Sequence, residues 1–319
     1  MLAAAGLAAV MAASGSPGGS MTSILYIAGA GRSGSTLLAS VLGQSQGVVD
    51  VGEVWKVWRV IGEPGRRCGC GSELVDCRFW GAVADAAPGV LDPDPVMLAT
   101  IARIGRARGS AKLWTQLRLG RAGVDAYAAR LARLYKAIVD VTGARVIIDC
   151  SKMPGPAMVV ESMSDLDVRV VHLTRDPRAV AASWGSRKVD PSGTNHLETR
   201  DPGAVARAWM TRALATETFV RRGADTYLRE SYERFAVEPE AVVDQLLSFL
   251  GEPTGSPAFV APSTVLLEAT HSTGGNPGRF ERRERVIALD DRWRTELSQD
   301  ARRKVERITT PLRQWYGYR

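Results

Sequence analysis

A glycine-rich turn near the start of the chain constrains the fold more than any other segment. The apolar run "SILYIAGA" at 23–30 predicts a buried strand, and "STLLASVLGQS" at 35–45 predicts a helix that Gly43 closes. The octapeptide "GAGRSGST", residues 29–36, therefore joins a strand to a helix. Such a turn is either a plain connection or a place where backbone N–H groups at a helix N-terminus bind an anion.

Strands and helices alternate along the rest of the chain. "GVVDVGE" and "ARVIIDCSK" predict two more strands, and helices are predicted for 95–137 and 204–222. "DVRVVHLTRDPRAVAASW" and "TYLRESYERFAVEPEAVVDQLLSFLG" each predict a strand, a turn and a helix, and a charged helix is expected from about Asp290. This alternation predicts an α/β fold, with a parallel β-sheet flanked by helices on both faces. Ligands of such sheets bind beyond the carboxyl ends of the strands.

Composition and charge narrow the function classes. The formal net charge of +7 fits either a solvated basic surface or an anionic ligand or partner. We expect no nucleic-acid partner, because the sequence has no nucleic-acid module and no basic stripe with interleaved aromatic residues. No run of about 20 apolar residues occurs beyond the start, so no membrane span is predicted. Residues 1–20 are Ala-rich without a basic start, which favours a disordered extension of a cytoplasmic protein over a signal peptide.

The cysteines are too few for a disulfide scaffold. Cys68, Cys70 and Cys77 lie together in "CGCGSELVDC", whereas Cys150 lies apart. Three close cysteines suit zinc, but a structural zinc site takes four ligands, and no histidine is near them in the sequence. The histidines are His172, His196 and His271. We therefore favour a turn with small buried thiols, or one disulfide, and predict no metal site.

The glycine-rich turn resembles the phosphate loop of nucleotide hydrolases, G-x-x-x-x-G-K-[ST], but lacks its lysine. Gly29 and Gly34 have the spacing of that loop and Thr36 takes its hydroxyl position, but Ser35 stands where the lysine would be. The basic residue comes earlier, at Arg32. A kinase or nucleotide hydrolase is therefore an alternative that the serine disfavours.

The segment "GRSGSTLL" resembles the loop with which sulfotransferases bind the 5′-phosphosulfate of 3′-phosphoadenosine 5′-phosphosulfate (PAPS). In that loop a Lys or Arg precedes Ser-Gly-[ST]-[ST], and an arginine there is similar to the tyrosylprotein sulfotransferases and their bacterial relatives. The resemblance implies a cationic role for Arg32. It also implies that the residues after it wrap the 5′-phosphosulfate: Ser33, Gly34, Ser35 and Thr36.

A second motif supports the same family. "HLTRDPRAVAASW" places Arg175 at a strand end and Ser183 eight residues later on the next helix, a pattern similar to the Arg and Ser that bind the 3′-phosphate in sulfotransferases. An arginine holds a phosphate by bidentate, charge-assisted hydrogen bonds, and the hydroxyl adds one donor. A surface ion pair would also explain Arg175, and a lone serine on a helix needs no function.

Softer resemblances complete the predicted site. Glu53, 21 residues after Arg32, is similar to the catalytic glutamate of the tyrosylprotein branch, and Lys152 ends a buried strand where several branches place a lysine at the leaving group. "GNPGR" resembles the segment that closes over the cofactor, and "ESYERFAVEP" a segment near the adenine or 3′-phosphate. The cofactor-binding candidates that they add are Tyr232, Gly275, Asn276 and Arg279. A helix cap, a surface lysine and a glycine-rich turn are the structural alternatives to these roles.

The resemblance implies a sulfotransferase of the P-loop NTPase-like fold, with PAPS as co-substrate. We expect a single domain over 21–319, with a helical insertion at about 90–137 on the side of an acceptor that is a small molecule, carbohydrate or lipid. Glu53 would be the base, Arg32 and Lys152 would neutralise the leaving group, and no metal is expected because a sulfuryl group carries less charge than a phosphoryl group. Trp55, Trp58 and Trp184 either stack on an acceptor ring or pack in the core. A non-catalytic nucleotide-binding protein remains the other alternative.

Overall fold

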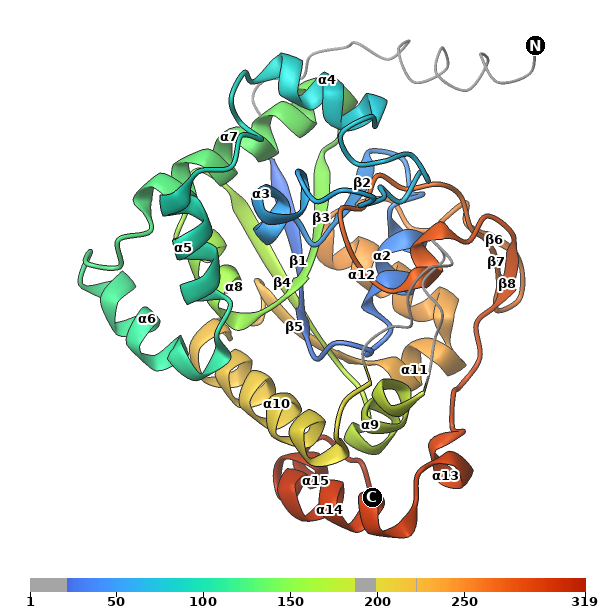
Figure 1. Cartoon of the computed structure of the whole chain (residues 1–319). Helices are drawn as coiled ribbons and strands as arrows, with labels where there is room; N and C mark the ends of the chain where they lie inside the picture. Colours follow the sequence, from blue (N-terminus) through green and yellow to red (C-terminus); the bar gives the residue numbers. More distant parts are fainter. Residues whose placement is uncertain (1–21, 187–198, 222) are drawn as a thin grey trace.

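A parallel sheet of five strands forms the centre of the molecule (Figure 1). The computed structural model describes residues 22–186, 199–221 and 223–319, so the predicted extension at 1–20 lies outside the described residues. The strand order is β2-β3-β1-β4-β5, and every neighbouring pair is parallel, which confirms the predicted α/β fold. The strands are β1 (Ser23–Gly29), β2 (Val48–Gly52), β3 (Val146–Lys152), β4 (Asp167–Thr174) and β5 (Tyr227–Ser231).

Helices cover both faces of the sheet because successive side chains of a strand point to opposite faces. Ile24 and Tyr26 of β1 pack into one hydrophobic cluster, whereas Leu25 and Ile27 pack into another. The first cluster is covered by α3 (Val57–Val60), α4 (Arg78–Ala86), α5 (Pro95–Ile104), α6 (Ser110–Arg118), α7 (Asp125–Thr142) and α8 (Pro154–Glu161). The second cluster is covered by α2 (Ser35–Leu42), α11 (Tyr232–Val237) and α12 (Pro239–Leu250).

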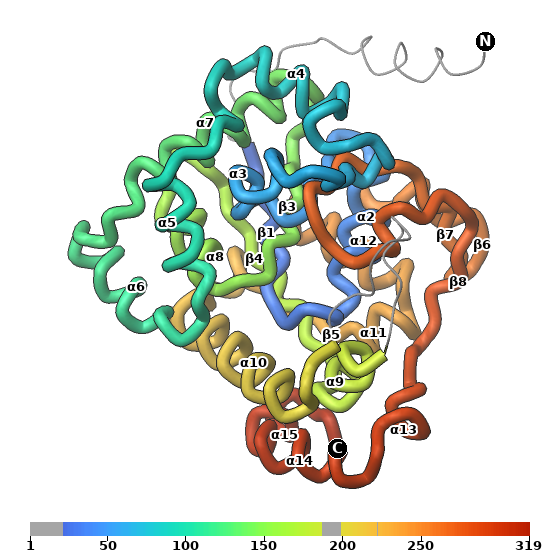
Figure 2. Tube along the Cα trace, in the orientation of Figure 1, coloured from blue at the N-terminus to red at the C-terminus, as the bar shows by residue number. Residues whose placement is uncertain are grey.

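A third cluster lies beyond the end of β1, where α9 (Pro177–Gly185), α10 (Pro202–Ala215) and α14 (Gln299–Thr309) meet. Both α9 and α10 begin with proline at the first helical position, and the preceding residues, Asp176 and Asp201, accept hydrogen bonds from the first turn. Figure 2 shows the C-terminal segment returning past α2 and then running down to α14 and α15 (Leu312–Trp315). That path brings residues 264–292 alongside the glycine-rich turn.

The predicted element boundaries are right for the strands and less accurate for the helices. The predicted helix at 95–137 consists of α5, α6 and the first part of α7. The charged helix expected from about Asp290 is α14, which begins later than predicted, after Ser298, and a short α13 (Trp293–Glu296) precedes it. A small antiparallel sheet was not predicted, since its strands have only three residues each. They are β6 (Phe259–Ala261), β7 (Thr264–Leu266) and β8 (Glu284–Val286). Within the described ranges, no helix has the length and apolar character needed to cross a membrane.

The order of the strands brings their carboxyl ends together. The chain passes from β1 to the edge strand β2, returns to β3 beside β1, and then crosses to β4 on the other side of β1. The residues that follow β1, β2, β3 and β4 therefore meet at one edge of the sheet, where ligands of open α/β sheets bind.

Candidate active site

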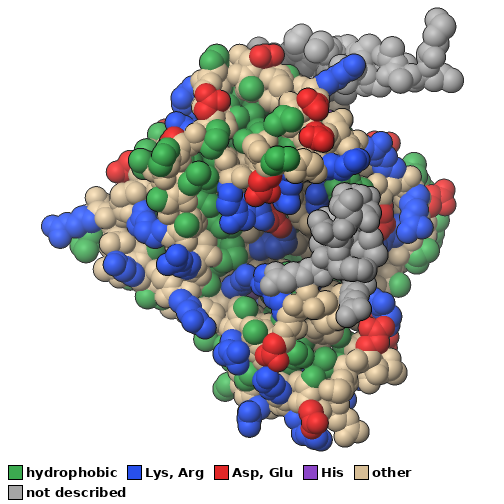
Figure 3. Space-filling view, viewed as in Figure 1, with side chains coloured by type: hydrophobic (Ala, Val, Ile, Leu, Met, Phe, Trp, Pro, Cys, Tyr) green, Lys and Arg blue, Asp and Glu red, His purple; other side chains and the backbone are tan. Residues whose placement is uncertain are grey.

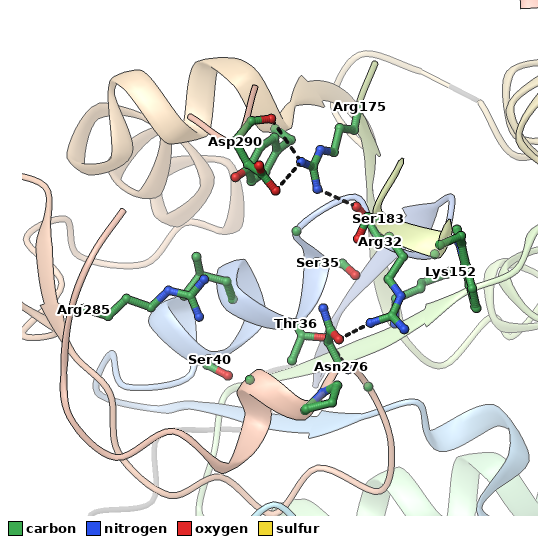
Figure 4. A pocket seen from close by; sticks show the side chains of 18 of the residues that line it. Arg32, Ser35, Thr36, Ser40, Lys152, Arg175, Ser183, Asn276, Arg285 and Asp290 are labelled. Carbon is green, nitrogen blue, oxygen red and sulfur yellow. Dashed lines mark hydrogen bonds and ion pairs between the residues drawn. The ribbon is translucent and has the colours of Figure 1, made fainter. Parts of the chain in front are cut away.

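A cleft of about 630 Å³ opens at the carboxyl edge of the sheet. Its walls are the start of α2, the ends of β3 and β4, the segment 275–278 and the segment 285–292. Figure 3 shows lysine and arginine side chains bordering the hollow at the centre of this face, with few acidic side chains among them. Figure 4 shows that the predicted site residues point into the same space from these separate segments.

The glycine-rich turn presents the N-terminus of α2 to the cleft. Gly34 has a φ of 86° and precedes α2, whose first turn has no side-chain cap and no acidic residue. The first N–H groups of the helix therefore remain available to an anion. Ser35 and Thr36 line the cleft. Ser33 does not line it: its hydroxyl is buried and has no hydrogen-bond partner among the described residues.

The turn has no room for a side chain at Gly34. A Cβ atom there would lie 2.5 Å from Cδ2 of Tyr232. We expect Gly34→Ala to lower the free energy of unfolding by roughly 2–5 kcal/mol, since a left-handed backbone costs about 1–2 kcal/mol in an L-residue and overpacking adds about 1–3 kcal/mol. Denaturant titration measures this change.

Gly81→Ala is the matched control. Gly81 lies within α4 and a Cβ atom there would meet nothing within 4 Å. Alanine should leave the stability unchanged or raise it by up to about 1 kcal/mol, because alanine favours a helix over glycine. Equal stability of the two variants would contradict the tight contact between the turn and Tyr232.

Arg32 lies at the mouth of the turn. Its φ is 71°, an uncommon conformation for a residue with a side chain. Its guanidinium donates a hydrogen bond to Oδ1 of Asn276 and lies 4.8 Å over the ring of Trp184. Burial and the nearby charge of Arg200 lower the pKa of Arg32 from its ordinary value. Both guanidiniums lie over the ring of Trp184, so two positive charges meet at this side of the cleft.

Arg175 follows β4 and lines the same cleft. Its guanidinium lies 4.1 Å over the ring of Tyr232, donates to the backbone oxygen of Arg32 at 2.9 Å and to Oδ2 of Asp290 at 3.2 Å (Figure 4). Its Nε–H is buried and has no hydrogen-bond partner among the described residues. Ser183 lines the same cleft from the second turn of α9.

Asp290 partly neutralises Arg175. A hydrogen bond from Arg292 and the charge of Arg175 lower the pKa of Asp290 to about 2, although burial acts in the opposite direction. The carboxylate therefore stays charged at neutral pH and occupies one of the hydrogen-bonding positions of the Arg175 guanidinium. The unpaired Nε–H of Arg175 fits one more anionic oxygen.

Glu53 follows β2 and lies between two lysines. Its Oε1 is 2.8 Å from Nζ of Lys152, and its Oε2 pairs with Nζ of Lys56. Burial alone would raise the pKa of Glu53, but the charges of Lys152 and then Lys56 outweigh burial and hold this pKa well below its usual range. Glu53 is thus a carboxylate at any pH near neutrality.

Lys152 ends β3 and projects between Glu53 and the glycine-rich turn. It is buried, has a φ of 67°, and donates to the backbone oxygen of Cys150 at 3.0 Å. Burial acts to lower its pKa, but Cys150 and Glu53 together raise that pKa above its ordinary value. A buried ammonium in a strained backbone conformation is typical of a functional position.

The segment that carries Gly275 and Asn276 closes one side of the cleft. The N–H of Asn276 donates to Oγ1 of Thr36 at 3.1 Å, and a Cβ atom at Gly275 would lie 2.9 Å from that same oxygen. Arg279 is absent from the lining of the cleft: its guanidinium donates to the backbone oxygens of Gly275 at 3.0 Å and of Arg67 at 3.4 Å. Arg279 thus stabilises this segment by joining it to the backbone of Arg67 outside the cleft.

Several residues of the site were not predicted from the sequence. Arg212 of α10 lies near Gly31 and Glu53, and burial followed by the charge of Arg200 lowers its pKa. The others are Lys56, Arg285, Asp290 and Arg292. Nothing in their local sequence separates them from ordinary surface charges. Of the three tryptophans, Trp184 lines the cleft, whereas Trp55 and Trp58 are buried in the first core cluster.

Comparison with known proteins adds an independent finding. A protein-family model described as "Sulfotransferase family" matches residues 25–256. Among solved structures, the sulfotransferase domain from the curacin biosynthetic pathway is 17 % identical, with a TM-score of 0.52 over 92 % of this chain and 98 % of that chain. The sulfotransferase domain of the olefin synthase of Synechococcus PCC 7002 is 18 % identical, with a TM-score of 0.48 over 92 % of this chain and 97 % of that chain. No curated protein matches.

Proposed function

The chain belongs to the sulfotransferase family, and we propose that it uses PAPS to transfer a sulfuryl group to a hydroxyl or amine of its acceptor. The observation that carries this proposal is the pairing of two anion-binding positions in one cleft. The N-terminus of α2 with Arg32 is one, and Arg175 with Ser183 is the other. A nucleotide with phosphates on both its 3′ and 5′ positions has the matching charges.

The residues of the cleft divide between the two phosphates of such a nucleotide. The uncapped first turn of α2 and the side chains of Arg32, Ser35 and Thr36 would hold the 5′-phosphosulfate. Arg175 would hold the 3′-phosphate with its unpaired Nε–H and with the N–H groups that Asp290 now shares. The ring of Tyr232, between Arg175 and Gly34, would position the nucleoside between the two phosphates.

The chemistry needs a base and a cation at the leaving group. When bound, PAPS supplies a sulfuryl group on a phosphate leaving group. Glu53 would accept the proton of the acceptor hydroxyl as that oxygen forms its bond to sulfur. Lys152 and Arg32 would neutralise the charge that develops on the bridging oxygen as its bond to sulfur breaks. Because Lys152 now binds Glu53, its movement toward the leaving group would also free the carboxylate to accept the proton.

One assay distinguishes the proposed activity from two other functions of the same fold, because each function forms different nucleotide products. A kinase or nucleotide hydrolase would consume ATP, although Ser35 stands where its phosphate loop needs a lysine. A non-catalytic nucleotide-binding protein would bind the bisphosphate and turn over neither donor. Incubating the chain with a cell extract, and with PAPS or ATP, and measuring formation of 3′,5′-bisphosphate and ADP separates all three. Only the first product supports the proposal.

The acceptor side is expected to be basic. Arg106 and Arg108, which precede α6, share a second cleft of about 460 Å³ with Arg207 and Arg212 of α10, beside Met153 and hence next to Lys152. We propose that the helices at 90–137 form the acceptor side here, and that an acidic acceptor enters along this cleft. A mass-spectrometric screen of cell extracts for a metabolite that gains one sulfuryl group would identify it.

The 3′-phosphate should account for much of the nucleotide affinity. We expect Arg175→Ala to weaken binding of 3′,5′-adenosine bisphosphate by roughly 1.5–3 kcal/mol, the range for hydrogen bonds to charged groups, or about 10- to 150-fold. Binding of AMP should change little. Isothermal titration calorimetry with both nucleotides measures the difference.

Arg145→Ala is the matched control for this measurement. Arg145 is an exposed arginine that pairs with Glu252 and precedes β3, so it lies at the opposite end of the strand from Lys152. Its loss should leave both affinities unchanged. Equal losses for the bisphosphate and AMP in Arg175→Ala would place Arg175 away from the 3′-phosphate.

A further inference from the structure

Three cysteines and one histidine meet outside the cleft. Cys68, Cys70 and Cys77 lie in the loop between α3 and α4, and His271 lies in the segment between β7 and Gly275. Their ligand atoms, three Sγ and Nδ1 of His271, all lie within 4.8 Å of one another. Cys77 is the closest to the others: its Sγ is 3.5 Å from Sγ of Cys68, 3.6 Å from Sγ of Cys70 and 3.4 Å from Nδ1 of His271.

These spacings match a tetrahedral ion rather than a disulfide. Zinc bonds of about 2.3 Å to sulfur and 2.0–2.1 Å to nitrogen place neighbouring ligands roughly 3.5–3.8 Å apart at the tetrahedral angle. A disulfide needs a sulfur–sulfur distance of about 2.05 Å. All three cysteines are free thiols. Iron–sulfur clusters also bind thiolates, but each iron of a [4Fe–4S] cluster binds one cysteine and each iron of a [2Fe–2S] cluster binds two at most, so three cysteine sulfurs do not gather around one iron.

We propose that Cys68, Cys70, Cys77 and His271 bind one Zn²⁺ in a tetrahedral structural site. Three soft thiolates and an imidazole are a ligand set that zinc prefers, and all four positions are filled by protein. Binding releases the three thiol protons to solvent and leaves a net charge of −1 on the site. The guanidinium of Arg282, which donates to the backbone oxygen of Cys70, lies beside that charge.

The surrounding contacts hold the ligands in place. Nε1–H of Trp80 donates to the backbone oxygen of His271 at 3.0 Å, and the ring of Phe79 stacks on the imidazole with centroids 4.6 Å apart. The N–H of Gly69 donates to the backbone oxygen of Ser272 at 3.0 Å. These contacts join the cysteine loop to the segment of His271 on either side of the ligands. They hold the four ligands in position, as neighbouring contacts do in metal sites.

The site fixes the base of the segment that closes the cleft. Two residues after His271, the N–H of Thr273 donates to the backbone oxygen of Val51 at the end of β2. Gly275 and Asn276 then contact Thr36 of the glycine-rich turn. A metal that joins residues 68–77 to His271 would therefore hold this segment against the sheet edge. Its role would be structural, because its ligands do not line the cleft.

The test is the metal content of the full chain. The protein is purified without a polyhistidine tag and under a thiol reductant, and its metals are measured by inductively coupled plasma mass spectrometry. We expect about one zinc per chain. X-ray absorption at the zinc edge should show three sulfur ligands near 2.3 Å and one nitrogen. Removal of zinc by a chelator should lower the melting temperature by about 5 °C or more, and adding Zn²⁺ should restore it.

Single variants assign the ligands. Cys77→Ser and His271→Ala should each lower the bound zinc well below one per chain. Cys150 lies in β3 outside the cluster, so Cys150→Ser should keep the zinc content of the wild type. If a ligand variant fails to fold, the absorption spectrum of the wild-type chain still identifies the ligands. The proposal is overturned if the reduced wild-type chain holds no zinc and takes up none on titration. Iron with inorganic sulfide, or a disulfide within the cluster under reducing conditions, would overturn it equally. None of these readouts depends on catalysis.

Discussion

Replacing Glu53 with glutamine should lower turnover by at least about a hundredfold, because general-base catalysis typically contributes 10²- to 10⁴-fold. Glutamine keeps the shape of the side chain and an oxygen that accepts hydrogen bonds from Lys152 and Lys56, but it cannot take up the acceptor proton. The measurement is the rate of 3′,5′-bisphosphate formation with PAPS and the identified acceptor. The affinity for the bisphosphate should remain close to that of the wild type, because the proposed role of Glu53 is to take the acceptor proton and not to bind the nucleotide.

The structure changes one part of what the sequence suggests for this variant. The sequence alone suggests that Glu53→Gln leaves the stability of the protein nearly intact. The contacts of Glu53 show instead that glutamine leaves the buried ammonium of Lys152 and the half-buried ammonium of Lys56 without their counter-charge. An unpaired buried charge is costly, so we expect a lower melting temperature for Glu53→Gln in the free protein. Bound bisphosphate, which is an anion, should recover part of that loss.

Glu63→Gln is the control for this experiment. Glu63 is exposed on the loop that follows α3, so its neutralisation removes the same charge without touching the cleft. Turnover and melting temperature should stay at the wild-type level. If Glu53→Gln retains turnover within about threefold of wild type, the glutamate only orients other groups, and the base must be another residue.

The fold was predictable from the sequence because its evidence is local. Apolar runs that end in polar residues mark the strands, and parallel strands bring their carboxyl ends to one edge of the sheet. The resemblance to sulfotransferases assigned the roles of Glu53, Lys152 and Arg175, and all three line the same cleft. The eight-residue spacing that the resemblance gave for Arg175 and Ser183 lies within one strand–turn–helix unit.

The rest of the site depends on contacts that no local pattern encodes. Asp290 reaches Arg175 across 115 residues, and His271 reaches Cys77 across 194 residues, through a segment whose strands have three residues each. Arg212 lies in α10, whose one other basic residue, Arg207, is exposed, and only the packing of α10 brings Arg212 toward Glu53. The prediction that Arg279 binds cofactor also rested on a local motif, and the guanidinium turns instead to Gly275 and Arg67.

Lys152→Met should slow transfer by about 10²- to 10³-fold, the cost of removing one donor that stabilises developing charge. Methionine keeps the length and apolar stem of the side chain but has no charge, so the bridging oxygen would develop its charge beside Arg32 alone. Bisphosphate affinity should fall much less than turnover, because the charge of the leaving group is greatest in the transition state. Lys136→Met, in an exposed lysine of α7 that pairs with Asp140, is the matched control and should change neither quantity.

The pH dependence distinguishes a role at the leaving group from a merely structural one. In the wild type the ammonium of Lys152 is the largest influence that lowers the pKa of Glu53 against the effect of burial. Glu53 therefore stays ionised well into the acid range, and the acid limb of the plot of kcat/KM against pH should lie below the ordinary glutamate value of about 4.3. In Lys152→Met the largest influence that opposes burial is lost while Lys56 remains beside the carboxylate, so the pKa of Glu53 rises and the acid limb moves to higher pH. If turnover falls while the acid limb stays in place, Lys152 does not set the pKa of Glu53 and acts only at the leaving group. Turnover near the wild-type level with an unchanged profile would show that Lys152 is a structural cation at the end of β3.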